Sequence, residues 1–85
     1  MPNKKDLVDK LTAKPMPGNF AVRDLDMLMS KCNCVKYQGG RGSGIGYRHL
    51  PTRHALQFDA PHPGKNLYRY QIKMAIKFLK DIGEI

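Results

Sequence analysis

The segment of residues 39–49 carries the residue types best suited to chemistry in this chain. Its sequence, GGRGSGIGYRH, contains five glycines among eleven residues. Glycine lets backbone amides approach an anion closely, and Arg41 and Arg48 add positive charge, so the segment suits a phosphate group. A glycine cluster can also serve only to turn the chain between two strands, and the surrounding sequence has to distinguish these interpretations.

The charge balance of the whole chain also favours an anionic partner. Its 85 residues include 15 Lys and Arg against 7 Asp and Glu, which gives a formal net charge of +8 and a pI near 9.8. Such a charge favours nucleic acid, an acidic protein or an anionic membrane surface. No apolar run approaches the roughly 20 residues of a membrane span, and no apolar signal segment follows the first residues. We therefore expect a small, soluble, cytoplasmic protein with no membrane partner.

The cysteines do not form a metal-binding motif. Cys32 and Cys34 are one residue apart, and a disulfide across so short a loop would be strained, so we expect reduced thiols. Three histidines accompany them, but a Cys-x-Cys pair without a second paired ligand motif is weak evidence for zinc. The sequence therefore predicts no metal and no cofactor. We expect Cys32 to close the apolar face of a helix and Cys34 to begin a strand.

Helical periodicity predicts two helices in the first part of the chain. Residues 4–13 form a short amphipathic helix that Asn3 can cap. The prolines and glycine of residues 15–18 break this helix and form a stiff joint. Residues 20–32 then place apolar side chains at i, i+3, i+4 and i+7, which indicates a core-facing helix with Asn19 as its cap.

Alternation of apolar and polar residues then predicts a sheet. Three short strands in a meander cover residues 35–37, 45–48 and 56–58. A final helix covers residues 67–82 and stops at Gly83. The fold class is therefore α+β, with the helices against one face of a three-stranded antiparallel sheet. We divide the chain into an N-terminal helix with its Pro-rich joint, residues 1–18, and a domain of residues 19–85.

Strand parity predicts which side chains occupy the uncovered sheet face. If Ile45 and Tyr47 point into the core, their neighbours in the strand point outward. The predicted open-face residues are Gly44, Gly46 and Arg48, together with Lys36, Gln57 and Asp59. A sheet face with glycines and basic groups suits a phosphate backbone, with residues 39–43 at its rim. By the same parity His49 is expected at a strand end and partly buried.

The last helix carries a second basic feature. Arg69, Lys73, Lys77 and Lys80 recur at helical spacing and form a ridge opposite the apolar stripe. Such a ridge is either a solvated helix face or a surface for an anionic partner. The partner would be an RNA backbone, recognised by shape and phosphate, or an acidic protein.

Two sequence motifs resemble a known family. Residues 42–47, GSGIGY, resemble the Gly-Ser-His-x-x-aromatic signature of the HicA toxins, which are small bacterial mRNA interferases. Residues 61–64, PHPG, and the Lys-rich helix after them resemble the C-terminal half of the same family. The resemblance covers about residues 20–85. It implies a double-stranded-RNA-binding-domain-like α-β-β-β-α fold, in agreement with the periodicity. It also implies a type II toxin-antitoxin system, a metal-independent mRNA endoribonuclease activity and a HicB-like antitoxin as partner.

The chain departs from this family at the catalytic position. The family's His, on the second strand, is held to carry RNA cleavage, and Gly44 stands there in this chain. Metal-free cleavage of RNA needs a base, an acid and cations around the phosphorane, and glycine offers no side chain for these roles. His62, between two prolines before the basic helix, is the best substitute acid or base. It can also be no more than a surface histidine in a rigid turn.

Two hypotheses from different classes follow. The first is a HicA-like ribonuclease toxin that holds mRNA on its open sheet face. The second is a non-catalytic RNA-binding or antitoxin-binding module on the same fold. Gly44 favours the second and the family resemblance favours the first. The predicted RNA contacts are Lys36, Arg41, Gly42, Ser43, Arg48, Lys65, Arg69, Lys73 and Lys77.

Overall fold

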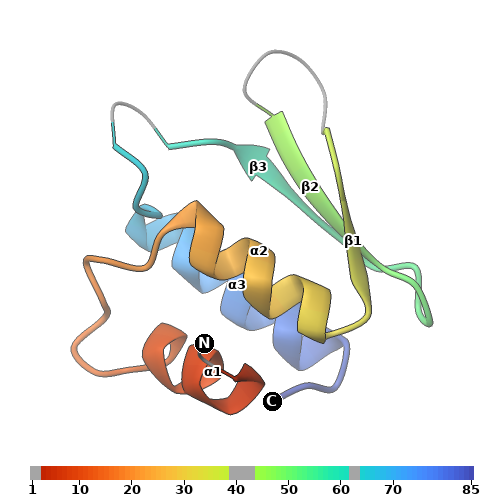
Figure 1. Cartoon of the computed structure of the whole chain (residues 1–85), viewed down its shortest axis with the longest axis horizontal. Helices are drawn as coiled ribbons and strands as arrows, with labels where there is room; N and C mark the ends of the chain where they lie inside the picture. Colours follow the sequence, from red (N-terminus) through yellow and green to blue (C-terminus); the bar gives the residue numbers. More distant parts are fainter. Residues whose placement is uncertain (1–2, 39–43, 62–63) are drawn as a thin grey trace.

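Three helices and one three-stranded antiparallel sheet form the described part of the chain, residues 3–38, 44–61 and 64–85 of a computed structural model. The elements in chain order are α1 (Lys4–Leu11), α2 (Val22–Lys31), β1 (Cys34–Tyr37), β2 (Gly44–His49), β3 (Ala55–Asp59) and α3 (Arg69–Asp81). The strands pair in the order β1-β2-β3, with β2 in the centre. Helices α2 and α3 lie along one face of the sheet and leave the other uncovered (Figure 1). The predicted α+β fold, with its α-β-β-β-α order after a short first helix, is confirmed.

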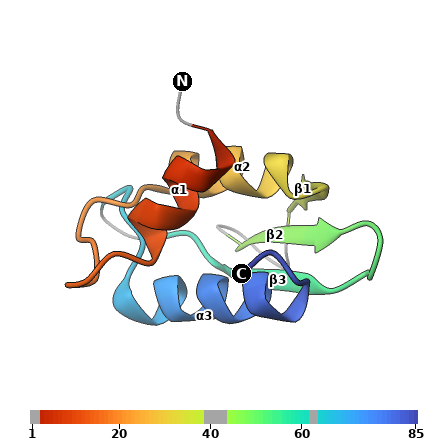
Figure 2. The ribbon, with the colours of Figure 1, turned by 90° about the horizontal axis from the view of Figure 1, so that it is seen from below.

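Helix α1 forms a further layer beyond α2 and α3, on the side away from the sheet (Figures 1 and 2). Asn3 caps it as predicted: its Oδ1 accepts a hydrogen bond from the backbone N–H of Asp6 at 2.8 Å. Leu7 and Leu11 are fully buried in the common core. The helix ends at Leu11, two residues earlier than the periodicity predicted. Because its apolar face is buried against α2, α1 belongs to the packed structure.

The start of α2 differs from the sequence-based expectation. The helix begins at Val22, and Ala21 occupies the cap position in place of Asn19. The Asp24 carboxylate accepts a hydrogen bond from the Ala21 N–H at 3.0 Å. The cap lies later because Ala21 is extended and forms an antiparallel bridge with Asn66, which consists of two hydrogen bonds, from Val22 N–H to Lys65 O and from Leu67 N–H to Phe20 O. This short ladder fixes the connector to the beginning of α2.

The inward face of the sheet packs against both helices. Tyr47 in the central strand and Leu56 and Phe58 in β3 point toward the helices, as their alternation predicted. The helices contribute Leu25, Leu28, Met29, Ile72, Ala75, Phe78 and Leu79 to the same core. Helix α3 begins at Arg69, two residues later than predicted, and Gly83 follows its end with a φ of 84°. The glycine stop is therefore confirmed, because that φ lies in the left-handed region.

Within the described residues, no helix is both long and apolar enough to cross a membrane.

Candidate nucleic-acid interface

The sheet face opposite the helices is the candidate interface, and we call it the open face. The strand register brings together Val35 and Tyr37 of β1, Gly44, Gly46 and Arg48 of β2, and Ala55, Gln57 and Asp59 of β3. The predicted placement of Gly46, Arg48 and Gln57 on this face is thus correct. Central strand β2 begins at Gly44, directly after residues 39–43 in the sequence, which lie outside the described part of the chain.

Tyr37 lies flat across the middle of the open face. It pairs directly with Gly46, and a Cβ built at position 46 would meet the Tyr37 ring, with Cε2 at 2.7 Å and Cε1 at 2.8 Å. No other residue type leaves room for this ring position, since Cβ atoms do not approach other atoms so closely. The Tyr37 hydroxyl donates a hydrogen bond to Gln57 Oε1 at 3.2 Å. The ring therefore spans the central strand from β1 to β3.

Arg48 reaches over this ring. Its guanidinium carbon lies 5.6 Å from the centre of the Tyr37 ring, within the range of a cation–π contact. The side chain is exposed, and none of the ion pairs among the described residues involves it. Arg48 can therefore offer its fork of N–H donors to a phosphate without breaking an existing ion pair.

Lys36 does not belong to the open face, which corrects the sequence-based prediction. Its register partner is Tyr47, so both residues point to the helix side of the sheet. There the Lys36 ammonium lies 3.1 Å from the Asp26 carboxylate of α2. The parity of β1 is shifted because Asn33, with a φ of 61°, turns the chain so that Cys34 points into the core as the first strand residue. Val35 and Tyr37 then point outward.

Asp26 holds the covered face of the sheet to α2. Besides its ion pair with Lys36, it accepts a hydrogen bond from the Tyr47 hydroxyl at 2.5 Å. Burial, together with the hydrogen bond to Asp26 and the negative charge of that group, raises the pKa of Tyr47 well above its ordinary value. The hydroxyl is therefore protonated at neutral pH and has a structural role.

Gly44, which the resemblance to the HicA toxins aligns with their catalytic His, is the first residue of β2 and pairs with Asp59. The histidines described in the structure lie at the opposite end of β2. His49 ends the strand, is buried as expected, and its Nδ1 is 2.8 Å from the Thr52 hydroxyl. His54 is exposed, and its Nδ1 is 2.8 Å from the same hydroxyl. Five residues of extended strand, about 17 Å, separate Gly44 from His49, so neither ring can act at Gly44.

Several predicted contact residues lie outside the described part of the structure. These residues are Arg41, Gly42 and Ser43 of the glycine-rich segment and His62 of the connector. Their roles at the rim of the open face and as substitute base stay predictions.

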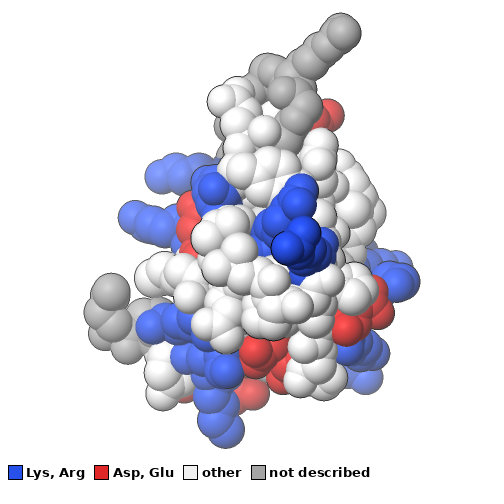
Figure 3. Space-filling view, turned by 90° about the vertical axis from the view of Figure 1, so that its right-hand side faces the viewer, with Lys and Arg blue, Asp and Glu red and all other residues white. Residues whose placement is uncertain are grey.

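The basic ridge of α3 lies on a different side of the molecule. Arg69, Lys73, Lys77 and Lys80 are exposed as predicted, but α3 packs on the covered face of the sheet. Lys77 already pairs with Asp81 at 3.0 Å. Lys65 is exposed in the connector beside the start of α2. Figure 3 shows Lys and Arg spread over the surface, with Asp and Glu among them in the lower half. The predicted basic residues therefore do not form one continuous patch.

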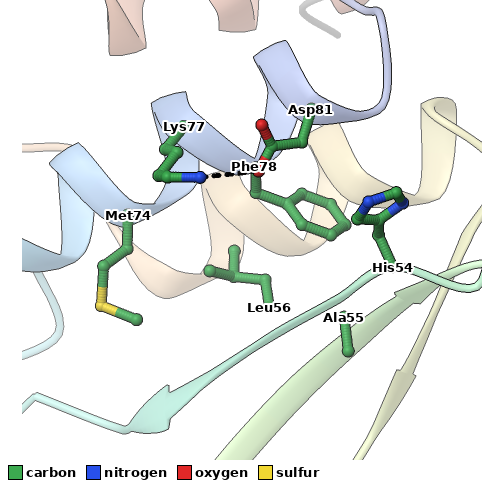
Figure 4. Close-up of a pocket in the computed structure, with 7 residues that line it drawn as sticks. All are labelled: His54, Ala55, Leu56, Met74, Lys77, Phe78 and Asp81. Atoms are coloured by element: carbon green, nitrogen blue, oxygen red, sulfur yellow. Dashed lines mark hydrogen bonds and ion pairs between the residues drawn. The ribbon is translucent and has the colours of Figure 1, made fainter.

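A shallow pocket of about 220 Å³ lies between α3 and the neighbouring edge strand β3. Its lining is formed by His54, Ala55, Leu56, Met74, Lys77, Phe78 and Asp81 (Figure 4). Two of its three polar side chains pair with each other, Lys77 with Asp81, and His54 contacts Thr52. The pocket consequently presents mainly apolar surface and no arrangement of acid and base facing a common point.

The two thiols are structural. Cys32 and Cys34 are both buried and unpaired with each other, as expected for reduced cysteines. Burial raises the pKa of each thiol to about 11, which keeps both protonated at neutral pH. No group of three His, Cys, Asp or Glu among the described residues could hold a metal ion.

Sequence analysis missed the two side chains that organise this region, Tyr37 and Asp26. Tyr37 was not among the predicted open-face residues, because the prediction placed its neighbour Lys36 there. The signal that could have found it is the hairpin register, because an aromatic residue directly opposite glycine can lie across the neighbouring strand. Asp26 gave no signal, because its partners come from strands ten and 21 residues away.

Comparison with known proteins found no matching family model, no similar curated protein and no similar solved structure.

Proposed function

We propose that this chain is an RNA-binding protein, a HicA-like toxin component whose open face holds the RNA backbone. The observation that carries the proposal is the open face itself: an uncovered sheet whose central strand carries exposed Arg48. The α-β-β-β-α order produces one covered and one open sheet face when the helix before the strands and the helix after them pack on the same side. The net charge of +8 favours an anionic ligand.

Electrostatic binding of this kind has a measurable signature. Phosphate contacts release counterions, so the logarithm of the affinity falls with the logarithm of the salt concentration, with a slope of roughly −0.7 per neutralised phosphate for single strands. Titration of a labelled RNA at several salt concentrations measures this slope. The double change Arg41→Ala with Arg48→Ala should weaken binding and make the slope less steep by roughly one to two such units.

A matched control separates the interface from the overall charge. Lys5 is exposed on α1 and pairs with Asp9, on the far side of the helix layer from the sheet. Lys5→Gln therefore lowers the net charge but should leave the salt dependence unchanged. A flat salt dependence of the unmodified protein, or no binding at low salt, contradicts the proposed function.

The open face by itself supports binding, and cleavage rests on the family resemblance. Gly44 carries no acid or base, and His49 and His54 are at the other end of β2. The second candidate function, a non-catalytic RNA-binding or antitoxin-binding module, is favoured by this geometry. If the chain does cleave RNA through His62, His62→Gln should lower turnover by about 10² to 10⁴-fold and leave RNA affinity nearly intact. Absence of cleavage by the unmodified protein with RNA binding retained selects the module.

The catalytic position can also be tested by restoring an imidazole. Gly44→His places a ring at the start of β2 on the same face as Arg48. If the resemblance locates the family position correctly, this variant should cleave RNA faster than the unmodified chain without added metal. Unchanged cleavage by a folded variant means that the surrounding residues do not support catalysis.

The proposed protein partner is a HicB-like antitoxin. An acidic antitoxin encoded in an adjacent reading frame should form a complex with this chain. Competition between that protein and RNA indicates binding at the open face, whereas simultaneous binding indicates a separate surface such as the α3 ridge.

A further inference from the structure

The open face contains an aromatic surface that phosphate binding alone does not explain. Tyr37 covers Gly46 with one side of its ring and is held at its far end by the hydrogen bond to Gln57. The inner side of the ring is thus used by the sheet. The outer side faces away from it, in a region where neither helix packs.

We propose that Tyr37 is a stacking site for an unpaired base, and that the RNA bound by the open face is single-stranded. This inference rests on the proposed RNA-binding function and names its substrate class. Every base has a flat π face, so stacking on tyrosine requires no particular sequence. A base inside an A-form duplex is already stacked between its neighbours and cannot offer this face.

Arg48 complements the ring in the way that a nucleotide requires. Its guanidinium carbon lies over the ring, 5.6 Å from the ring centre, so a stacked base takes the place of this contact and releases the guanidinium for the adjoining phosphate. The base would stack on Tyr37 while the adjoining phosphate receives the N–H donors of Arg48. Exposed Val35, paired with Arg48 across the strands, adds apolar surface beside the ring.

The position of the ring is fixed before any ligand arrives. Glycine at 46 allows the ring to lie flat, and the Gln57 hydrogen bond favours this position of the ring over the sheet. A preorganised ring loses little conformational entropy when a base stacks on it, so more of the stacking free energy appears as affinity. An aromatic that only shielded glycine would need the inner contact alone.

A tryptophan reporter tests the stacking directly. The chain contains no Trp, so Tyr37→Trp provides a single fluorophore on the open face. An oligouridine should quench its fluorescence, and an abasic oligomer with the same number of phosphates should not. The control is Tyr70→Trp, which replaces an exposed tyrosine on α3 and should report no quenching by either oligomer. Equal quenching by both oligomers, or equal quenching of both reporters, overturns the proposal.

If the larger indole of Tyr37→Trp does not take the position of the Tyr37 ring, affinity measurements test the stacking instead. Tyr37→Leu should lower the affinity for oligouridine by about tenfold and leave the affinity for the abasic oligomer unchanged. Tyr37→Phe keeps the ring and should stay within about twofold of the unmodified protein. Urea unfolding of each variant verifies the fold. A Tyr37→Leu variant that is folded and binds oligouridine normally overturns the stacking site.

The two oligomers also separate failure of this inference from failure of the proposed function. Binding of both oligomers with equal affinity, independent of Tyr37, overturns base stacking and leaves electrostatic RNA binding in place. Binding of neither oligomer at low salt overturns RNA binding and the stacking site together.

Discussion

The two faces of one sheet differ in how their polar groups are satisfied. On the covered face, Lys36 and Tyr47 both bind Asp26 of α2, so the protein itself satisfies them. On the open face, Tyr37 binds Gln57, but Arg48 has no ion pair within the described part of the chain. Strands β1 and β2 each carry one Lys or Arg: Lys36 lies on the covered face in an ion pair, and Arg48 lies on the open face without one among the described residues. The net charge favours an anionic partner, and strand parity decides which of the two cations is exposed on the open face.

The largest expected difference between the two faces is in stability. Leu28 is completely buried between α2 and the sheet, so Leu28→Ala should lower the free energy of unfolding by about 2–5 kcal/mol. The open-face control, Val35→Ala, removes a half-exposed side chain and should change it by less than about 0.5 kcal/mol. Urea unfolding measures both. Similar losses in the two variants would contradict the division into a covered and an open face.

A second comparison uses the two tyrosines. Tyr47→Phe removes the hydrogen bond to the Asp26 carboxylate and should cost about 1.5 kcal/mol, while Tyr37→Phe, which loses a bond between neutral, exposed groups, should cost less than about 1 kcal/mol. The pKa of Tyr47 is raised in the fold, so the native state keeps this proton when the unfolded chain loses it.

This difference gives the Tyr47 comparison a pH signature. Because the unfolded state then binds fewer protons than the native state, the free energy of unfolding must fall as pH rises above the ordinary tyrosine value of 10.0. Tyr47→Phe should make this fall less steep. Unfolding curves between pH 8 and about pH 11 test the expectation.

A third comparison sets the open face against the α3 ridge. Arg48→Gln should lower RNA affinity at low salt by about tenfold, because a charge-assisted contact with phosphate is lost. Lys73→Gln makes a similar change of charge on the exposed side of α3 and should alter affinity by less than about twofold. Titrations of one labelled RNA with both variants compare the sites. A larger loss of RNA affinity for Lys73→Gln than for Arg48→Gln would indicate that RNA binds at the α3 ridge.

The smallest effect concerns Lys36. Since its ammonium pairs with Asp26, Lys36→Gln should leave RNA affinity unchanged and lower stability by less than about 1 kcal/mol, as for a partly exposed ion pair. A loss of RNA affinity as large as that expected for Arg48→Gln would indicate that Lys36 contacts RNA and that its ion pair with Asp26 opens on binding.

The order of elements could be predicted because each is encoded by its own residues. Periodicity identified all three helices and strands, and Asn3 and Gly83 act within one turn of their helix ends. The cap of α2 could not be predicted from Asn19, because residues 20–22 pair with a segment more than 40 positions later. Only the folded chain brings that partner close.

The side-chain directions at the candidate site could be predicted where a strand has a long apolar–polar alternation. They could not be predicted where the alternation is short. Six residues of β2 define a parity that places Arg48 correctly. Strand β1 has only four, and an apolar-polar-apolar sequence fits either face. The left-handed turn at Asn33 and the space above Gly46 determine which face each β1 side chain occupies. Neither feature can be recognised in a local sequence pattern. The arrangement of basic residues on separate sides likewise depends on how α3 packs.

The buried thiols at the junction of α2 and β1 allow the rate at which this part of the fold opens to be measured. Cys32 and Cys34 flank the single residue that joins helix to strand, and neither is accessible in the native state. An alkylating reagent can reach them only when this junction separates, and the raised pKa leaves few reactive thiolates before that event. The rate of alkylation therefore measures how often the junction between α2 and β1 opens.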